Sequence, residues 1–190
     1  MNNEEKLTWA DKVLARTLLP LIPRWCRPNH ITMVRFITTP VVGWLLWTRQ
    51  YTAALPLFFI VAFTDALDGA LARVRGQVTE WGKLYDPLAD KFLICLAVSI
   101  LMFRYLDPLV GVLTIVLEIT IILSALIKKQ HGVAVQANLW GKIKMHFQVY
   151  AVACIVLAIL FQLPALQTVG AGLLYMALTF GIMSLLTYSV

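Results

Sequence analysis

Charged side chains are scarce in this sequence of 190 residues. Aspartate, glutamate, lysine and arginine together make up 14% of the chain, whereas apolar residues make up 60%. A soluble globular domain has about a quarter of its residues charged and roughly half of them apolar. The mean hydropathy of +0.79 is correspondingly high. This composition excludes an ordinary soluble domain or a disordered chain, and it favours a protein with several membrane-spanning helices.

Cysteine is also rare, with three in the chain. They are Cys26, Cys95 and Cys154, and their spacing matches neither a metal site nor a disulfide framework. We therefore interpret them as small apolar packing residues. The N-terminal stretch MNNEEKLTWADK lacks the basic start and the short apolar core of a cleaved signal peptide, so we expect no such leader.

Six apolar runs divide the rest of the sequence, and each approaches the length of a membrane-spanning helix. The expected spans are residues 31–47, 53–71, 84–103, 108–127, 147–161 and 166–187. The connections are short and contain no low-complexity linker or fixed-period repeat. We therefore predict an all-α polytopic membrane protein with a single domain over 1–190, in which 31–187 form a six-helix bundle.

The segment 7–25 precedes the first span and alternates apolar and basic side chains with a roughly helical period. This pattern is typical of an amphipathic helix that lies in the membrane interface rather than crossing the bilayer. Pro20 and Pro23 should end or bend that helix. The alternative interpretation is an exposed basic arm.

The basic residues are unevenly distributed among the connections. They gather before the first expected span, after the second and after the fourth, whereas the opposite connections carry only Arg49 and Arg104. The positive-inside rule therefore predicts that both termini face the cytoplasm. Much of the formal net charge of +6 lies on that face, where it would attract anionic lipid and phosphate.

Four of the ten acidic residues lie within or beside the second and third expected spans. They are Asp65, Asp68, Asp86 and Asp90. The members of each pair are three or four residues apart, so each pair shares one helix face. Ionised carboxylates within a span are costly unless they are paired, and they indicate function. Because a short connection joins the two helices, we expect the pairs to meet.

Four carboxylates in one place would repel one another unless cations neutralise them. Oxygen ligands without histidine or cysteine suit Mg²⁺ or Mn²⁺, and two such ions can hold a diphosphate that undergoes displacement. A cation or proton pathway is the alternative function. The structural alternative is a set of salt bridges to Arg73, Arg75, Lys83 and Lys91.

Two glycines lie beside these acids. Gly69 directly follows Asp68, and Gly82 lies one turn before Asp86. A missing side chain allows a neighbouring helix or a ligand to approach closely. Arg73 continues the helix face of the first acidic pair, and its guanidinium suits phosphate. These features favour a diphosphate nucleotide over a bare ion as the ligand.

From Asp65 to Asp90 the chain reads D-A-L-D-G-A-L-A-R, eight further residues, then G-K-L-Y-D-P-L-A-D. This stretch resembles the complete signature of the CDP-alcohol phosphatidyltransferases, D-x2-D-G-x2-A-R-x8-G-x3-D-x3-D. The resemblance implies an integral enzyme of a bacterial cytoplasmic membrane, with its site facing the cytoplasm. It would move a phosphatidyl group from CDP-diacylglycerol to an alcohol and release CMP. It also implies a homodimer, with membrane lipid and no nucleic acid as partners.

The resemblance assigns roles to individual residues. The ligands of two Mg²⁺ or Mn²⁺ ions would be Asp65, Asp68, Asp86 and Asp90, and Asp90 would also be the general base. The CDP-binding residues would be Asn29, Thr32, Asp65, Asp68, Gly69, Ala72, Arg73, Thr79 and Gly82. Asn29 and Thr32 belong to a P-N-x-x-T sequence at the start of the first span, which ordinary turn or capping chemistry also explains.

Two segments bear on the acceptor alcohol. Residues 86–91, D-P-L-A-D-K, resemble the form found in phosphatidylglycerophosphate synthases and their cardiolipin synthase relatives. Residues 141–144, G-K-I-K, resemble a segment of glycerophosphate-using enzymes, so Lys142 and Lys144 would bind an anionic acceptor, with glycerol 3-phosphate as the leading candidate. Positive-inside anchoring is the alternative role of these lysines.

Two positions depart from the pattern of glycerophosphate-using enzymes. Met145 stands where that segment usually carries threonine, and Leu117 is the second departure. Leu117, next to Glu118, stands where glycerophosphate enzymes usually carry arginine. This departure leaves phosphatidylglycerol, as in cardiolipin synthase, and inositol phosphate open as alternative acceptors. Glu118 itself could orient the lysines or accept a hydrogen bond from a hydroxyl.

Overall fold

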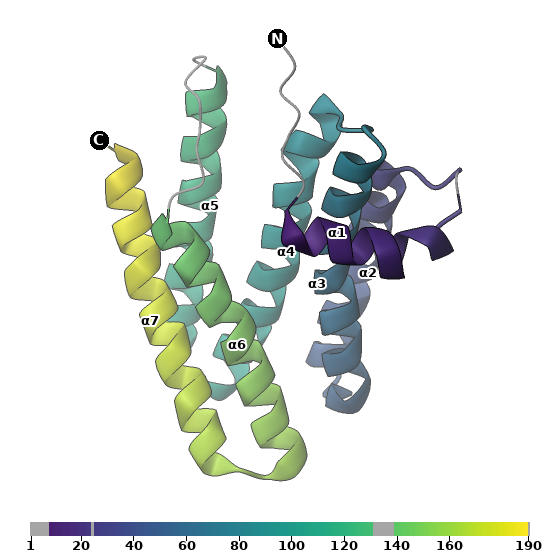
Figure 1. The fold of residues 1–190 in the computed structure, drawn as a ribbon. Helices are drawn as coiled ribbons and strands as arrows, with labels where there is room; N and C mark the ends of the chain where they lie inside the picture. The colour runs from purple at the N-terminus through teal and green to yellow at the C-terminus, as the bar shows by residue number, and fades with distance from the viewer. Residues whose placement is uncertain (1–7, 24, 131–138, 190) are drawn as a thin grey trace. The chain divides into compact units, whose positions relative to one another are not determined.

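The computed structural model describes residues 8–23, 25–130 and 139–189. Over these ranges the chain is helical throughout and contains no strand, which confirms the all-α fold class (Figure 1). The elements are α1 (Trp9–Thr17), the 3-10 helix η1 (Leu19–Leu21), α2 (Pro28–Trp47), α3 (Tyr51–Val74), α4 (Glu80–Tyr105), α5 (Pro108–Gln130), α6 (Leu139–Phe161) and α7 (Pro164–Ser189).

Each of the six expected spans lies within one helix from α2 to α7, and the start of α6 is eight residues earlier than expected. Three helical segments within the described residues are long and apolar enough to cross a membrane, namely Tyr51–Val74, Leu139–Phe161 and Pro164–Thr187. These segments identify a membrane protein. A shorter apolar stretch, Pro108–Ser124, lies in α5. The count of six membrane spans remains a prediction, because α2 and α4 carry polar residues of the candidate site among their apolar ones.

The amphipathic segment expected over 7–25 is divided in the structure. Helix α1 ends at Thr17, and η1 follows with Pro20 inside it, as the prolines predict. In α1 the side chains of Trp9 (81%) and Val13 (40%) are exposed, whereas that of Asp11 is buried. A helix that exposes apolar side chains and buries an acid is unlike the surface helix of a soluble protein. Its position in the membrane interface stays a prediction.

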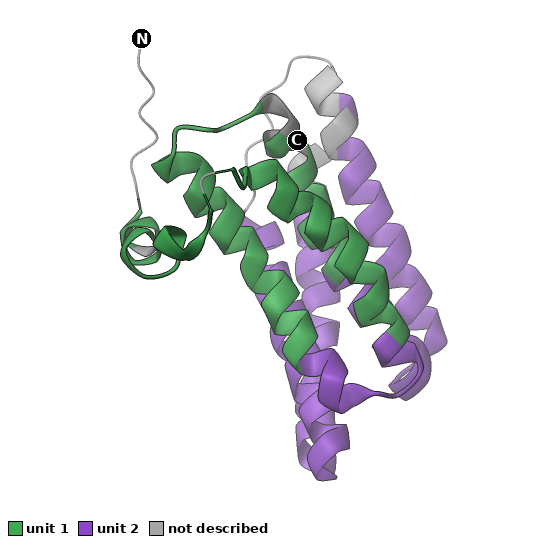
Figure 2. Ribbon diagram, turned by 90° about the vertical axis from the view of Figure 1, so that its right-hand side faces the viewer, with its two compact units in different colours: residues 1–44, 56–93 green, residues 45–55, 94–190 purple. Residues whose placement is uncertain are grey.

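The chain divides into two compact units (Figure 2). The first comprises residues 1–44 and 56–93, and it contains all four signature aspartates. Within this unit α1 runs crosswise to α3 (Figure 1). Arg75 donates hydrogen bonds to the carbonyl oxygens of Ile22, Pro23 and Cys26, and it thereby ties the segment between η1 and α2 to the end of α3.

The second unit comprises residues 45–55 and 94–190. In it α6 and α7 pack side by side in antiparallel order (Figure 1). The faces that they bury are built from small and branched apolar side chains, including Ala151, Val152, Ile155, Leu174 and Ala177. Close packing of such side chains stabilises helix pairs in membranes, where exclusion of water contributes little.

Candidate active site

Arg35 of α2 holds both aspartates of the first signature pair. Its Nη1 donates to Asp65 Oδ1 at 2.8 Å, its Nη2 donates to Asp68 Oδ2 at 2.7 Å, and its Nε donates to Thr64 Oγ1 at 3.1 Å. The arginine and Asp68 side chains are almost completely buried, whereas 43% of the Asp65 side chain is exposed. The rigid fork of guanidinium donors therefore fixes two carboxylates that lie one helical turn apart.

Arg35 is the site residue that the sequence prediction missed. The expected salt-bridge partners were arginines and lysines that follow the aspartates in the chain, but Arg73 pairs with Asp11 and Arg75 binds backbone carbonyls. The sequence did carry a signal, because Arg35 is a charged residue inside an apolar run. It also lies three residues after Thr32, on the same helix face.

Thr32 joins the two aspartate pairs. Its hydroxyl donates to Asp86 Oδ1 at 2.6 Å and lies 3.2 Å from Asp68 Oδ2. Thr32 is fully buried, so these contacts form away from water. The structure thus gathers one carboxylate from α3 and one from α4 around a single hydroxyl of α2. Asp90 lies one turn beyond Asp86 on α4 and is also buried.

A second cluster of polar side chains lies at the start of α4. Thr79 accepts a hydrogen bond from the backbone N–H of Gly82 at 3.0 Å, which is the contact of a helix N-cap. The Thr79 hydroxyl donates to Asn29 Oδ1 at 3.0 Å. A Cβ on Gly82 would lie 3.2 Å from both Asp86 Oδ2 and Thr79 Oγ1. The absence of a side chain at Gly82 therefore leaves space for Asn29, Thr79 and Asp86 to lie close together.

Arg73 and Gly69 lie on the same face of α3 as the first aspartate pair. Arg73 donates from Nε and Nη2 to the two carboxylate oxygens of Asp11, at 2.9 and 2.7 Å. These bonds hold the pKa of Asp11 well below its ordinary value. A Cβ on Gly69 would lie 3.3 Å from Arg73 Nη1, so the space beside this glycine is bordered by the guanidinium. Ala72 also lies on this face and is partly buried.

The donor chemistry of the site suits a divalent cation. Asp68 Oδ1 is buried and has no hydrogen-bond partner among the described residues, so one carboxylate oxygen is not satisfied by the protein. Carboxylate oxygens are the ligands that Mg²⁺ and Mn²⁺ prefer. No group of three or more histidine, cysteine, aspartate or glutamate side chains in the described ranges already has the spacing of a metal site.

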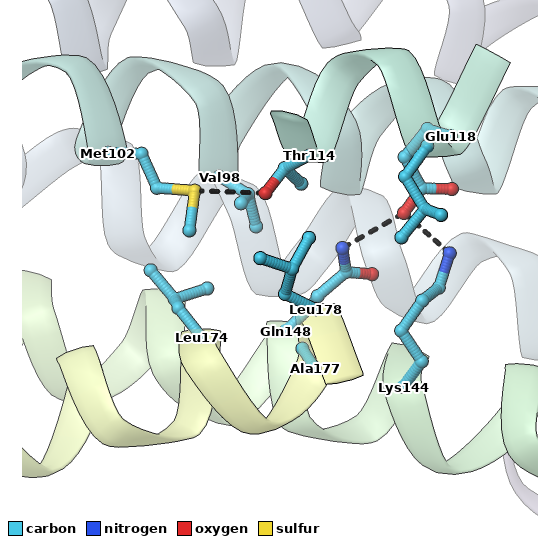
Figure 3. Close-up of a pocket in the computed structure, with 10 residues that line it drawn as sticks. Val98, Met102, Thr114, Glu118, Lys144, Gln148, Leu174, Ala177 and Leu178 are labelled. Atoms are coloured by element: carbon cyan, nitrogen blue, oxygen red, sulfur yellow. Dashed lines mark hydrogen bonds and ion pairs between the residues drawn. The ribbon is translucent and has the colours of Figure 1, made fainter. Parts of the chain in front are cut away.

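The two lysines assigned to the acceptor lie in the second unit and differ from each other. Lys142 is exposed. Lys144 is buried and its Nζ lies 2.5 Å from Glu118 Oε1, which also accepts from Gln148 Nε2 at 2.9 Å (Figure 3). Glu118 therefore orients one of the lysines, as the sequence suggested. The charge of Lys144 is already paired, and its role toward an acceptor stays a prediction.

These polar residues border a pocket between α4, α5, α6 and α7 (Figure 3). Its remaining lining is mostly apolar and includes Leu117, the residue that replaces the arginine of glycerophosphate enzymes. Leu117 is buried and lines the same pocket as Lys144, so an arginine at this position would add a second cation to that pocket. Glu118 Oε2 is buried without a hydrogen-bond partner in the described part of the chain.

The chain is similar to a known protein family and to several named enzymes. A family model described as CDP-alcohol phosphatidyltransferase matches residues 25–183. The chain is 34% identical over 146 residues to CDP-diacylglycerol–glycerol-3-phosphate 3-phosphatidyltransferase of Bacillus subtilis, which covers 68% of this chain and 76% of the relative. The enzyme of the same name from Rickettsia typhi is 28% identical over 157 residues, covering 78% and 81%. Human cardiolipin synthase (CMP-forming) is 38% identical over 85 residues, covering 44% and 28%.

Proposed function

Because the chain belongs to the CDP-alcohol phosphatidyltransferase family, we propose that it transfers the phosphatidyl group of CDP-diacylglycerol to an alcohol and releases CMP. The observation that carries this proposal is the meeting of the two halves of the signature. Asp68 of α3 and Asp86 of α4 both lie against the Thr32 hydroxyl of α2. This arrangement supports the assignment of all four aspartates to one site.

We propose that glycerol 3-phosphate is the acceptor and phosphatidylglycerophosphate the product. The relatives that match most of this chain are named for that reaction, whereas the cardiolipin synthase match covers 44% of the chain. Lys142 is exposed and supplies a charge for the acceptor phosphate. Phosphatidylglycerol and inositol phosphate remain the competing acceptors, because Leu117 replaces the usual arginine.

Members of this family generally use divalent metal ions. The residues that would hold two ions, Mg²⁺ or Mn²⁺, are Asp65, Asp68, Asp86 and Asp90. When bound, such ions supply positive charge that disperses the charge of the diphosphate. Arg35 supports this site through ion pairs, since it fixes the carboxylates of Asp65 and Asp68 and partly offsets their mutual repulsion.

The remaining residues provide binding and proton transfer. Asn29 and Thr79, already hydrogen-bonded to each other, bind the cytidine end of the substrate beside Gly82. The buried carboxylate of Asp90 accepts the proton of the acceptor hydroxyl. The hydroxyl oxygen then forms a bond to the phosphorus on the lipid side, and the bond from that phosphorus to the oxygen of CMP breaks.

We further propose six membrane spans, one domain over residues 1–190 and both termini in the cytoplasm of a bacterial cell. The exposed Trp9 and Val13 of α1 support a position of that helix in the membrane interface. Membrane-impermeant labelling of single cysteines near each terminus tests the orientation. We also propose a homodimer, and cross-linking in detergent that yields only monomers would contradict it.

Release of CMP distinguishes this function from the alternative, a carboxylate-based ion or proton transporter. Purified protein in mixed micelles with CDP-diacylglycerol, Mg²⁺ and glycerol 3-phosphate should release CMP. The same preparation reconstituted into liposomes should show no ion flux above that of empty liposomes. Ion flux without CMP release would identify the transporter instead.

A further inference from the structure

An ion pair joins the N-terminal helix to the signature segment of α3. Asp11 of α1 and Arg73 of α3 meet in two parallel N–H···O bonds of 2.9 and 2.7 Å, which is a bidentate geometry. The Asp11 side chain is 2% exposed and that of Arg73 is 31% exposed. The two residues are 62 positions apart in the chain, so this contact fixes where α1 docks on α3.

Asp11 is itself held rigidly. Its Oδ2 accepts a hydrogen bond from the backbone N–H of Thr8 at 2.8 Å, and its own N–H donates to the Thr8 hydroxyl at 3.2 Å. These reciprocal bonds form a capping box at the start of α1. The carboxylate that receives Arg73 therefore has a defined position before any substrate binds.

The position of the Arg73 guanidinium bears on the candidate site. It borders the space beside Gly69, where a Cβ would lie 3.3 Å from Nη1 and 3.4 Å from Nη2. Gly69 directly follows Asp68, whose carboxylate belongs to the cluster around Arg35 and Thr32. The guanidinium is thus fixed on the helix face that carries the first aspartate pair.

We propose that Asp11 is a positioning residue for the CDP-lipid: it holds Arg73 across Gly69 in the orientation in which the arginine meets the substrate. The inference rests on the proposed function and adds to it a role for the N-terminal helix, which lies outside the signature. A guanidinium that is already oriented loses less conformational freedom when it binds a phosphate group. Without Asp11, more of that ordering must take place at the moment of binding.

The ion pair is present at any pH near neutrality. The hydrogen bonds from Arg73 lower the pKa of Asp11, so the carboxylate remains charged well below the pH at which an ordinary aspartate takes up a proton. The stabilisation is fully present above the ordinary pKa of aspartate and is lost only as the pH falls toward the lowered value. Binding measurements at neutral pH therefore report on the intact pair.

The test compares Asp11→Asn with Thr8→Ala. The first variant removes the charge that orients Arg73, whereas the second weakens the cap of α1 and leaves both bonds between Asp11 and Arg73. Equilibrium binding of CDP-diacylglycerol in micelles with Mg²⁺, without acceptor, should weaken about 10- to 100-fold in Asp11→Asn. This is the loss typical of removing a residue that orients a binding side chain. Thr8→Ala should bind like the wild type, and the acceptor KM should be unchanged in both.

Equal weakening in the two variants would overturn the proposal, because Asp11 would then act only by folding α1. Unchanged or tighter binding in Asp11→Asn would also overturn it. If Asp11→Asn does not fold, Asp11→Glu provides the test: it keeps the charge but displaces the carboxylate, so weaker CDP-diacylglycerol binding is expected and wild-type binding contradicts the proposal. Wild-type protein that binds no CDP-diacylglycerol would instead refute the proposed function.

Discussion

Arg35 and Asp68 form an ion pair inside the first unit, with Nη2 and Oδ2 2.7 Å apart and with at most 1% of either side chain exposed. A buried ion pair is weakly favourable at best for stability, because both charges lose their hydration. The same arginine also binds Asp65, so one cation serves two acids of the signature. We interpret Arg35 as the residue that allows carboxylates to be concentrated at this place in the fold.

Replacement of Arg35 by glutamine should destabilise the protein strongly. The change leaves a buried carboxylate without its cation, which costs about 3–5 kcal/mol. Thermal unfolding in detergent with a chelator present measures the effect. Arg27→Gln is the matched control, since Arg27 is exposed just before α2. Equal unfolding temperatures for the two variants would show that the charge of Arg35 does not stabilise the buried carboxylates of the site.

The aspartates should divide into two functional classes. Asp65→Asn, Asp68→Asn and Asp86→Asn should weaken both CDP-diacylglycerol binding and turnover. Asp90→Asn should lower turnover far more than binding, by about 10²–10⁴-fold, because it removes the general base. Separate measurement of the binding constant and kcat distinguishes the classes. Near-normal turnover in Asp90→Asn would remove this residue from the proton transfer.

Removal of divalent metal should abolish CMP release without unfolding the protein. The helices pack through apolar faces and through the Arg35 ion pairs, which need no metal. Activity should return with Mg²⁺ or Mn²⁺, and Mn²⁺ bound to the resting protein should be detectable by electron paramagnetic resonance and reduced in Asp68→Asn. Full activity in excess chelator would contradict the assignment of the aspartates as metal ligands.

Lys142 and Lys144 should respond differently to alanine. Lys142→Ala should raise the KM of an anionic acceptor about 10- to 150-fold, the loss expected for one charge-assisted contact, with little change in stability. Lys144→Ala should destabilise the protein, because it leaves Glu118 buried without a cation.

A double variant separates pairing from acceptor binding at Lys144. Lys144→Met combined with Glu118→Gln removes both charges and should recover much of the lost stability. If the double variant is stable and still has a normal acceptor KM, Lys144 does not bind the acceptor. A large rise in that KM would show that the lysine contacts it.

Much of the architecture was predictable from local patterns. Apolar runs located α2 to α7, and Pro20 predicted that the N-terminal helix would not continue through it: α1 ends at Thr17 and Pro20 lies in η1. The signature between Asp65 and Asp90 was recognisable because its glycines and acids have fixed spacing within two consecutive helices. The family model that matches the chain confirms the family that this signature indicated, and the roles of its individual residues stay predictions.

The long-range polar contacts could not be obtained in the same way. Arg35 is 33 residues from Asp68, and Asp11 is 62 residues from Arg73, so no helical period relates them. Lys144 and Glu118, which pair across two helices, are likewise 26 residues apart. Such pairs depend on which helix faces meet, and a single sequence does not specify this.

An acceptor panel tests the central claim most directly. Folded, purified protein is given CDP-diacylglycerol labelled in its phosphatidyl group, Mg²⁺, and in turn glycerol 3-phosphate, inositol phosphate, inositol, serine or phosphatidylglycerol. We predict labelled phosphatidylglycerophosphate and CMP in equal amounts with glycerol 3-phosphate, and the loss of both in Asp90→Asn. Product with serine or free inositol but none with glycerol 3-phosphate would contradict the acceptor, and no CMP with any alcohol would contradict the transferase.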